Sequence, residues 1–421
     1  MTLQELKQNI TDAKKASFSL LVLTAKERQN VLLRLSELLI KNTQEIIAAN
    51  REDIRLSKQE GKEASFIERL SLNEEKIHAM ADSARLIANE PDFLFETLEK
   101  RTRPSGLSIK KVRFPLGLIA IIYESRPNVT IDSFVLSFKS GNALLLKGGK
   151  EIQSTNRTLV ALIYEALQAE RIDTGIVKNL DGVDRKISIE LMRNSLIDCL
   201  IPRGGKNLID FVKKYARVPV IITGASVVHT YVDSDVEIDK AVRIIQNAKT
   251  RRVSICNALD VILLHQDIYR DVLQKLSQDL VEKKVEIRAD KRSYSVLEKS
   301  HYPYLKKAGA KDFDTEFLDY ILAVKIVNDF VEALEHISKH SLGHSEAIIT
   351  RSKKHAEQFF RDIDAACLYL NTSTQFSDGG EFGMGGEIGI STQKLHARGP
   401  FAATELTTYK YLVESKGAIR K

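Results

Sequence analysis

One cysteine of the chain stands in a setting that suits a nucleophile. Cys256 lies in the segment Lys249-Thr250-Arg251-Arg252-Val253-Ser254-Ile255-Cys256-Asn257-Ala258, shortly after three cationic residues. Nearby positive charge stabilises the thiolate, which is the form of cysteine that attacks carbon. The alternative is a small buried hydrophobic residue, as unpaired cysteines often are. Cys199 and Cys367 lie in or at the start of apolar runs, which indicates inert side chains.

Two glycine-containing segments could approach a ligand. The segment Pro202-Arg203-Gly204-Gly205-Lys206 follows an apolar run and opens a helix, so it offers free amides and cations to a phosphate; an ordinary strand-to-helix turn is the alternative. Residues 379–389 hold six of the 21 glycines, which indicates either a flexible loop or a close backbone approach. They do not match the dinucleotide fingerprint, because Ile388 takes the sixth place counted from Gly383.

Arginines and histidines give further candidates. Arg126 and Arg398 stand in turn-like contexts, where a guanidinium can bind a carboxylate or a phosphate, although each also fits an ordinary surface arginine. His336, His340 and His344 repeat every four residues, and the first two could share one helical face. Neither a carboxylate nor a cysteine of the sequence pattern completes a ligand set, so we predict no metal site.

The elements that would position these residues are of two kinds. The first 100 residues read as successive helices, with capping boxes predicted at Thr24 with Glu27 and at Ser71 with Glu74. From Gly117 onward, short β-branched runs alternate with amphipathic stretches, which is typical of parallel sheets in an α/β fold. We expect strands at 118–123, 143–147, 198–201, 218–223, 258–264, 321–327, 347–350 and 367–370, and helices at 156–169, 207–215, 268–283 and 330–339. Two lobes are predicted, joined near Cys256, with ligands at the carboxyl ends of strands and in the cleft between domains.

Composition sets outer limits on the function. The 421 residues suit two or three domains, and 43% hydrophobic with 28% charged residues is typical of a soluble globular protein. The net charge of +7 suits an anionic small substrate as well as nucleic acid, but basic residues are not interleaved with aromatics and Trp is absent, so we predict no nucleic-acid partner. Neither a secretory signal nor a membrane span is expected, and three scattered cysteines suggest a reducing, cytoplasmic location.

Five segments together resemble the γ-glutamyl phosphate reductases, or glutamate-5-semialdehyde dehydrogenases, a family within the aldehyde dehydrogenase superfamily. They are Ser125-Arg126-Pro127-Asn128-Val129-Thr130, Ser140-Gly141-Asn142 with Leu146-Lys147-Gly148-Gly149, Pro202-Arg203-Gly204-Gly205, Cys256-Asn257-Ala258, and the stretch from Glu387 to Pro400. The resemblance implies two Rossmann-like parallel-sheet lobes, a helical N-terminal leader and a small oligomerisation arm. It implies an NADP-binding domain at 1–250 that resumes near 371–400, a catalytic domain at 251–370, and an arm with a C-terminal tail at 101–114 and 401–421.

The resemblance also implies an activity. The family reduces L-glutamyl 5-phosphate with NADPH to L-glutamate 5-semialdehyde and phosphate, the second step from glutamate to proline. Hydrolytic aldehyde dehydrogenases carry a glutamate that activates water, whereas the corresponding place here reads Thr223-Gly224-Ala225-Ser226. A hydrolytic, NAD-dependent aldehyde dehydrogenase is the competing enzyme hypothesis. The expected partners are the small-molecule substrate, further copies of the chain in a dimer or tetramer, and an acyl-phosphate kinase, glutamate 5-kinase, that hands over the substrate.

Roles follow from the resemblance for individual residues. Cys256 would be the nucleophile, and its amide with the side chain of Asn128 would stabilise the oxyanion. The cofactor would be held by a lysine at the adenosine ribose, two glycines at the pyrophosphate and a carboxylate at the nicotinamide ribose, which are Lys147, Gly204, Gly205 and Glu316. Arg126 and Arg398 are hypotheses for the substrate's carboxylate and phosphate. Val253, Ser226, Val228 and Gly386 depart from the residues usual in the family and affect only the expected loop geometry.

Overall fold

The computed structural model describes residues 1–180, 182 and 184–420. The chain divides into two compact units, the first of residues 1–223, 383–389 and 400–421, and the second of residues 224–382 and 390–399. The second unit thus begins at Gly224, earlier than the junction near 250 expected from the sequence. The reason is that β7 (His229–Val232) and α10 (Ile238–Thr250), which the sequence pattern did not assign to it, belong to the second sheet and its helical layer.

The first unit opens with the expected succession of helices. Capping boxes start two of them, at Thr2 with Glu5 and at Thr24 with Glu27. The box predicted at Ser71 is wrong: Asn73 caps the next helix, and Ser71 ends the short helix before it. The helices of this unit are α1 (Leu3–Ala16), α2 (Ala25–Lys41), α3 (Thr43–Gln59), α4 (Ala64–Leu70), α5 (Glu74–Asn89), α6 (Asn128–Lys139), α7 (Gln153–Ala169), α8 (Arg185–Leu191) and α9 (Lys206–Tyr215).

A four-stranded parallel sheet forms the centre of the first unit. Its order is β5 (Val177–Asn179), β4 (Ala143–Lys147), β3 (Leu118–Tyr123), β6 (Cys199–Arg203). Every residue of β3 is buried, which explains its uninterrupted apolar run. The strand predicted at 218–223 is wrong, because this segment forms isolated bridges at Val220 and Thr223 instead of a ladder. The Pro219 carbonyl accepts from Leu200 at 2.9 Å and the Ile221 amide donates to the Leu200 carbonyl at 3.0 Å, but neither Pro219 nor Pro202 of β6 has an N–H to extend the pairing.

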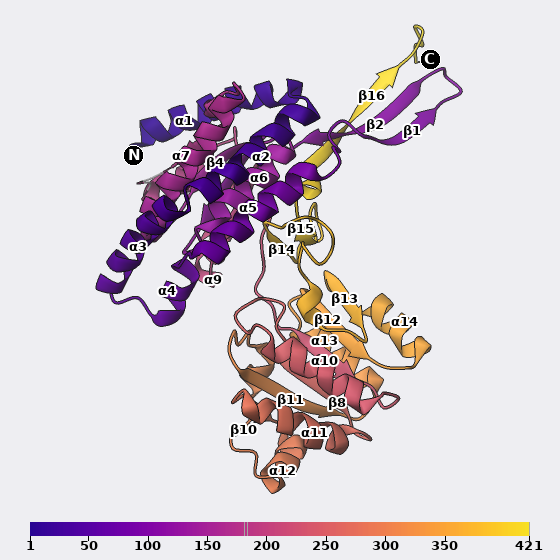
Figure 1. Cartoon of the computed structure of the whole chain (residues 1–421). Helices are drawn as coiled ribbons and strands as arrows, with labels where there is room; N and C mark the ends of the chain where they lie inside the picture. The colour runs from indigo at the N-terminus through magenta and orange to yellow at the C-terminus, as the bar shows by residue number, and fades with distance from the viewer. Residues whose placement is uncertain (181, 183, 421) are drawn as a thin grey trace. The chain divides into compact units, whose positions relative to one another are not determined.

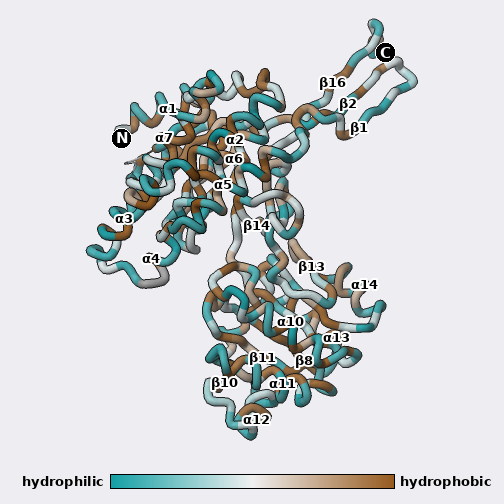
Figure 2. The backbone as a smooth tube through the Cα atoms, viewed as in Figure 1, coloured by the Kyte–Doolittle hydropathy of each residue, from teal (hydrophilic) through white to brown (hydrophobic). Residues whose placement is uncertain are grey.

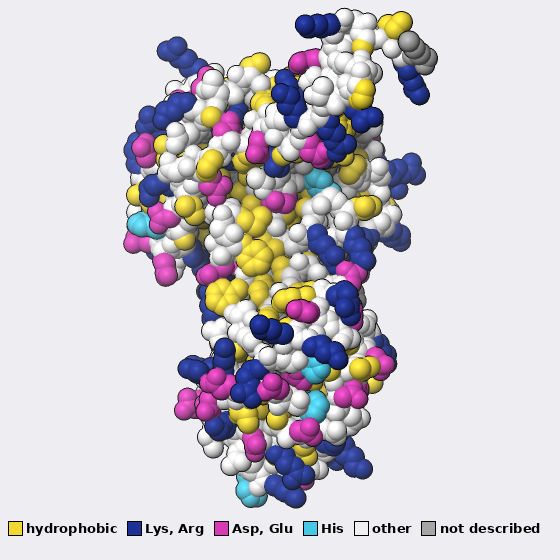
Figure 3. Space-filling model, turned by 90° about the vertical axis from the view of Figure 1, so that its right-hand side faces the viewer, with side chains coloured by type: hydrophobic (Ala, Val, Ile, Leu, Met, Phe, Trp, Pro, Cys, Tyr) yellow, Lys and Arg dark blue, Asp and Glu magenta, His cyan; other side chains and the backbone are white. Residues whose placement is uncertain are grey.

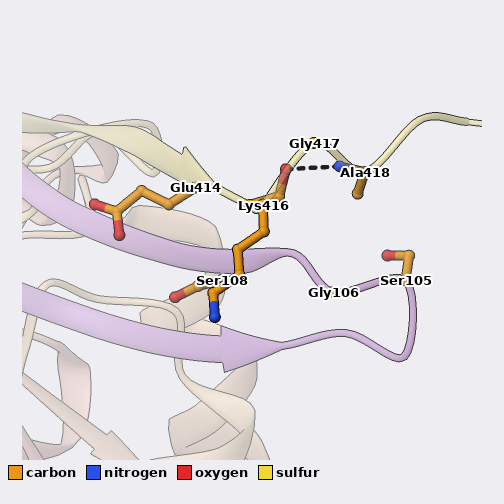
Figure 4. Close-up of a pocket in the computed structure, with 8 residues that line it drawn as sticks. Ser105, Gly106, Ser108, Glu414, Lys416, Gly417 and Ala418 are labelled. Atoms are coloured by element: carbon orange, nitrogen blue, oxygen red, sulfur yellow. Dashed lines mark hydrogen bonds between the residues drawn. The ribbon is translucent and has the colours of Figure 1, made fainter.

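Three antiparallel strands form an arm on the first unit. They are β1 (Thr97–Thr102), β2 (Ser108–Pro115) and β16 (Thr407–Glu414), with β2 in the middle, and Figure 1 shows the yellow β16 beside the purple β1 and β2. The structure therefore pairs the two segments that the sequence analysis assigned to an arm. A hollow at its end is lined by the turn at Ser105 and Gly106 and by Glu414–Ala418 (Figure 4). None of the predicted site residues lines it.

A seven-stranded parallel sheet forms the second unit. Its order is β10 (Leu305–Lys307), β9 (Glu286–Ala289), β11 (Ile321–Val327), β8 (Val261–His265), β7, β12 (Ser345–Ile349), β13 (Cys367–Leu370). Hydrophobic residues run along its strands (Figure 2), and two buried clusters pack against them. The remaining helices are α11 (Tyr269–Glu282), α12 (Lys291–Lys299), α13 (Phe330–His340) and α14 (Lys353–Asp362). The parallel α/β architecture predicted from the alternating pattern is confirmed in both units.

The chain passes between the units through irregular segments and two short paired strands, β14 (Gly389–Ser391) and β15 (Gly399–Phe401). On the face drawn in Figure 3, Lys and Arg side chains are interspersed with Asp and Glu. Within the described residues, helices are too short or too polar to cross a membrane.

Candidate active site

The predicted site residues fall into three groups. Lys147, Gly204 and Gly205 meet at the carboxyl edge of the first unit's sheet, and Arg126 with Asn128 stands at the start of α6 in the same unit. The second unit contains the other group, namely Cys256, Glu316 and Arg398.

Cys256 lies in a turn between α10 and β8. Its side chain is half-buried, whereas Cys199 and Cys367 are buried. Burial raises the pKa of Cys199 to about 12, which keeps that thiol protonated and unreactive. Cys256 is therefore the cysteine whose exposure suits a nucleophile, as the sequence predicted.

The turn that carries Cys256 is fixed by buried side chains from the segment after β13. The side chain of Gln375, in the 3₁₀ helix η5 (Thr374–Phe376), donates to the carbonyl of Ala248 at 2.9 Å and to that of Arg252 at 3.1 Å. Asn257, next to the cysteine, donates through Nδ2 to the Ser377 carbonyl at 3.0 Å. Carbonyls at a helix end lack partners within the helix, so these donors stabilise the connection between α10 and the nucleophile.

Ser226 lies directly behind the cysteine backbone. Its side chain is fully buried, and its hydroxyl donates a short hydrogen bond to the carbonyl oxygen of Cys256. The same Oγ lies 3.1 Å from Oε1 of Glu316, in the loop before β11. Desolvation, followed by the neighbouring carboxylate of Asp260, raises the pKa of Glu316 to about 7. The structure thus brings Glu316 to the cysteine's backbone.

Two further buried charged groups lie under this turn. Lys249, at the end of α10, is fully buried and donates to the Leu259 carbonyl at 3.0 Å, and burial lowers its pKa to about 8. Asp260 accepts from the amides of Phe317 and Val228 at 3.0 and 3.2 Å. Burial raises the pKa of Asp260 to about 6, and the Lys249 ammonium opposes that shift. The ammonium of Lys249 therefore contacts the Leu259 carbonyl and faces the Asp260 carboxyl beneath the turn.

In the first unit, the predicted cofactor residues surround a carboxyl group that sequence reasoning missed. Glu124 follows β3, and its Oε2 accepts from the amide of Gly205 at 3.3 Å. A Cβ on Gly204 would lie 2.5 Å from the same oxygen, so any other residue there would displace the Glu124 carboxyl. Desolvation of the carboxyl raises the pKa of Glu124. Desolvation of the amine lowers the pKa of Lys147, and the carboxylates of Glu151 and Glu124 oppose this lowering. The amide at the start of α9 already faces an anionic oxygen.

The start of α6 is held in an unusual conformation. Ser125 has φ of 52°, in the left-handed region, and both its amide and its hydroxyl donate to Glu151, at 2.8 and 3.2 Å. The side-chain Nδ2 of Asn128 donates to Oδ2 of Asp132, one turn along the helix, at 2.9 Å. Burial raises the pKa of Asp132 to about 6. Glu151 and Asp132 therefore set the geometry of the segment that contains Arg126 and Asn128.

The remaining arginine is committed to an ion pair. Nη2 of Arg398 donates to Asp364 at 2.6 Å, and Lys394 contacts the other oxygen of the same carboxylate. Asp364 thus binds two residues of the segment between β14 and β15, Lys394 and Arg398. A substrate anion at Arg398 would have to share the guanidinium with this carboxylate.

The glycine-rich segment is explained by close approach. A Cβ on Gly385 would lie 2.2 Å from the Glu90 carboxyl, and one on Gly389 would lie 2.6 Å from Nη1 of Arg203. The Glu90 carboxyl and the Arg203 guanidinium end flexible side chains, but Gly385 has a φ of 69° and a Cβ on Gly389 would also lie 2.5 Å from Cγ2 of Thr223. The close-approach alternative therefore explains Gly389, and the backbone conformation favours glycine at 385.

The repeated histidines form a structural group. His336 and His340 share one face of α13, with ring centroids 4.3 Å apart, and burial lowers the pKa of His336 to about 2. His340 bonds to Asp314 at 2.6 Å, and His344 lies beyond the end of the helix. The described residues contain no cluster of three His, Cys, Asp or Glu side chains with a geometry that could hold a metal ion.

The residues that sequence reasoning missed follow or precede strands. Glu124 and Glu151 have a weak signal, because each neighbours a predicted site residue at a strand end. Ser226 was noted only as a departure, and Gln375 carries no motif of its own. Their roles depend on strand order, which brings segments far apart in the chain to one sheet edge.

Comparison with known proteins identifies the family of the chain. Residues 1–300 match the sequence profile of the aldehyde dehydrogenase family. The chain belongs to the aldehyde dehydrogenase family and is an oxidoreductase of that family.

Individual relatives are more specific. The chain is 46% identical over 409 residues to a protein named gamma-glutamyl phosphate reductase from Carboxydothermus hydrogenoformans, covering 97% of both. It is similar to the crystal structure of gamma-glutamyl phosphate reductase from Thermotoga maritima, with a TM-score of 0.94, 39% identity, and coverage of 99% of this chain and 100% of that one. The family resemblance predicted from the motifs is confirmed. A glyceraldehyde-3-phosphate dehydrogenase from Methanocaldococcus jannaschii, solved with NADP, shares the fold at a TM-score of 0.71 and 16% identity, with 99% and 95% of the two chains covered.

Proposed function

We propose that the protein reduces L-glutamyl 5-phosphate to L-glutamate 5-semialdehyde and phosphate with NADPH, in the synthesis of proline from glutamate. The names of relatives that match nearly the whole chain support the substrate. The observation that carries the proposal is the half-buried Cys256 in a turn whose backbone is fixed on both sides. Aldehyde dehydrogenases use NAD or NADP, and NADPH is the proposed form.

Cys256 is the proposed nucleophile. Its thiolate attacks the acyl carbon of the substrate, the bond to the phosphate oxygen breaks, and a thioester remains on the enzyme. NADPH supplies the hydride that reduces this thioester. The resulting thiohemiacetal oxyanion collapses, so that the aldehyde leaves and the thiolate of Cys256 returns. The backbone amide of Cys256 and the side chain of Asn128 are the proposed oxyanion donors.

The first unit fits the cofactor's anionic groups. The amide of Gly205 already donates to a carboxylate oxygen, and a Cβ on Gly204 would crowd that oxygen at 2.5 Å. A pyrophosphate oxygen would replace Glu124 at this amide, and Lys147 would bind the adenosine ribose or its 2′-phosphate. Glu316 is proposed to bind the nicotinamide ribose, and Arg126 and Arg398 to bind the anionic groups of the substrate.

The absence of a glutamate at 223–226 supports acyl-phosphate chemistry. Hydrolysis of the thioester needs a general base that activates water, and Thr223 and Ser226 instead donate to the carbonyls of Pro202 and Cys256. Neither hydroxyl is then a base for water. The thioester can persist until phosphate or hydride reaches it.

Oxidation of glutamate 5-semialdehyde with NADP tests the proposal in the reverse direction. NADPH is expected to form only when inorganic phosphate or arsenate is present, because one of them must accept the acyl group from Cys256. Acid formation with NAD and simple aldehydes in phosphate-free buffer would contradict the proposal and indicate a hydrolytic enzyme.

Two partner proposals accompany this function. The arm of β1, β2 and β16 exposes Leu98, Tyr409, Tyr411 and Val413, which suits pairing with another copy of the chain in a dimer or tetramer. The substrate is a reactive acyl phosphate, so direct transfer from glutamate 5-kinase is the second proposal. Sedimentation of the purified protein, alone and with the kinase, tests both.

A further inference from the structure

A chain of hydrogen bonds links Glu316 to the backbone of the nucleophile. The Cys256 carbonyl can only accept, so the hydroxyl of Ser226, which contacts it, must donate its single proton there. Oε1 of Glu316 lies 3.1 Å from the same hydroxyl oxygen. Oγ of Ser226 can also donate to Oε1 of Glu316, so two acceptors share its one proton, and both contacts are full hydrogen bonds only when Glu316 is protonated and donates to Oγ. The arrangement is therefore complete only with a protonated Glu316.

We propose that Ser226 is a positioning residue that couples the protonation state of Glu316 to the conformation of the Cys256 turn. When Glu316 is neutral, its proton is donated to Ser226, and Ser226 holds the Cys256 carbonyl. When Glu316 loses that proton to solvent, its carboxylate competes with the carbonyl for the one proton of Ser226. A charged acceptor forms the stronger bond, so the hydrogen bond from Ser226 to the Cys256 carbonyl is broken.

The surroundings of Glu316 set the pH range in which its carboxyl ionises. The carboxyl faces Asp260, which precedes β8, and the amide of Ser226, while desolvation is the largest influence. Desolvation and the Asp260 carboxylate raise the pKa of Glu316 to about 7, and the contacts with Ser226 oppose that shift. Lys249 of α10 and His229 of β7 face Asp260, and Asp319 faces Lys249, so these positive charges act on Glu316 through Asp260. Ionisation of Glu316 therefore occurs near neutrality.

Ser226 is the residue at which the link between Glu316 and the Cys256 turn can be tested. Its side chain has 0% exposure, so water does not compete for the hydroxyl. Alanine at this position would remove the link and leave Glu316 and Asp260 in place. Threonine would keep the hydroxyl. Ser254, an exposed residue of the same turn, provides a matched control.

The test is the rate of alkylation of Cys256 by iodoacetamide as a function of pH, followed on the Cys256 peptide by mass spectrometry without substrate or cofactor. In the wild-type protein, and in Ser254→Ala, we expect an inflection near pH 7 in addition to the ionisation of the thiol. Ser226→Ala and Glu316→Gln are expected to lose that inflection, and Ser226→Thr to keep it. Thermal unfolding of each variant identifies any that fails to fold.

Two outcomes would overturn the inference. If Ser226→Ala keeps the inflection while Glu316→Gln loses it, Glu316 influences the thiol by direct electrostatic interaction, and Ser226 does not transmit the effect of its ionisation. If the wild-type profile shows only the thiol ionisation, Glu316 has no influence on the turn. The inference rests on the proposed role of Cys256, but alkylation requires no turnover. A failure here is thus distinguishable from a failure of the proposed reaction.

Discussion

The two units present their site residues at opposite edges of their parallel sheets. In the first unit, Glu124, Lys147 and Gly204 follow or end strands, so they lie at the carboxyl edge. In the second unit, Cys256 and Glu316 precede strands and lie at the amino edge. The proposed ligand residues of the first unit thus lie at the carboxyl edge, where parallel sheets usually bind ligands, whereas those of the second unit lie at the amino edge.

The difference has a physical reason. At a carboxyl edge the chain enters a helix, whose first amides are free to bind an anion. At an amino edge the chain leaves a helix, whose last carbonyls need donors, and here Gln375, Lys249 and Ser226 donate to the turn. We expect Glu124 at the first edge to be displaced by the cofactor, and Gln375 and Lys249 at the second edge to keep their contacts. The first arrangement suits a cofactor that binds and dissociates, and the second suits a nucleophile held in a fixed position.

Replacement of the nucleophile gives the largest expected effect. Cys256→Ala should lower reductase activity by more than about 100-fold, roughly 2.7 kcal/mol of barrier, because no thioester can form. Steady-state NADPH oxidation measures the loss, and cofactor binding with thermal unfolding checks that the fold persists. Cys199→Ala is the control, since that thiol is buried and protonated, and it should keep activity. Equal losses in the two variants would contradict the assignment.

Replacement of Gln375 tests whether the contacts at the amino edge hold the Cys256 turn in place. Gln375→Ala leaves the Arg252 carbonyl without its donor, so the free energy of unfolding should fall by about 1–3 kcal/mol, measured by urea denaturation. Because the turn also loses its fixed geometry, kcat should fall while KM for NADPH is unchanged. Gln274→Ala, at an exposed position on α11, should change neither quantity. An altered KM for NADPH with normal kcat would show that Gln375 serves the cofactor instead.

At the carboxyl edge, Lys147 is expected to act on the cofactor alone. Lys147→Ala should raise KM for NADPH by about tenfold, the value of one charge-assisted contact to a phosphate, and KM for NADH by less. Stability should be almost unchanged, because Lys147 lies at the end of β4 and half-exposed. Initial rates at varied cofactor concentrations give both constants. An equal rise for the two cofactors would contradict a contact with the 2′-phosphate.

The parallel sheets were predicted from the sequence, because the alternation of apolar runs with amphipathic stretches is a local signal. Cys256 was predicted from the cations that precede it and Gly204 from its glycine turn, whereas Lys147 was assigned only through the family resemblance. The strand at 218–223 was wrong, because its β-branched residues did not reveal that prolines on both segments remove ladder donors. Glu124, Ser226 and Gln375 were missed because their partners are set by strand order, which no local pattern contains. The residues predicted from motifs are those to which we assign the chemistry, and the missed residues contact the same segments.

The smallest expected effect tests whether Glu124 is exchangeable. Glu124→Gln keeps an acceptor for the Gly205 amide but removes a negative charge beside the proposed phosphate position, so KM for NADPH should fall by about two- to threefold, as for a partly exposed charge pair. The pKa of Glu124 lies above its ordinary value, and its charge appears as the pH rises through that pKa. In the wild-type protein, KM should therefore rise with pH over that interval, whereas in the variant it should stay flat. Glu165→Gln, an exposed glutamate of α7, should behave as wild type. A higher KM in Glu124→Gln would mean that the carboxylate binds the cofactor, and both edges would then rely on fixed contacts.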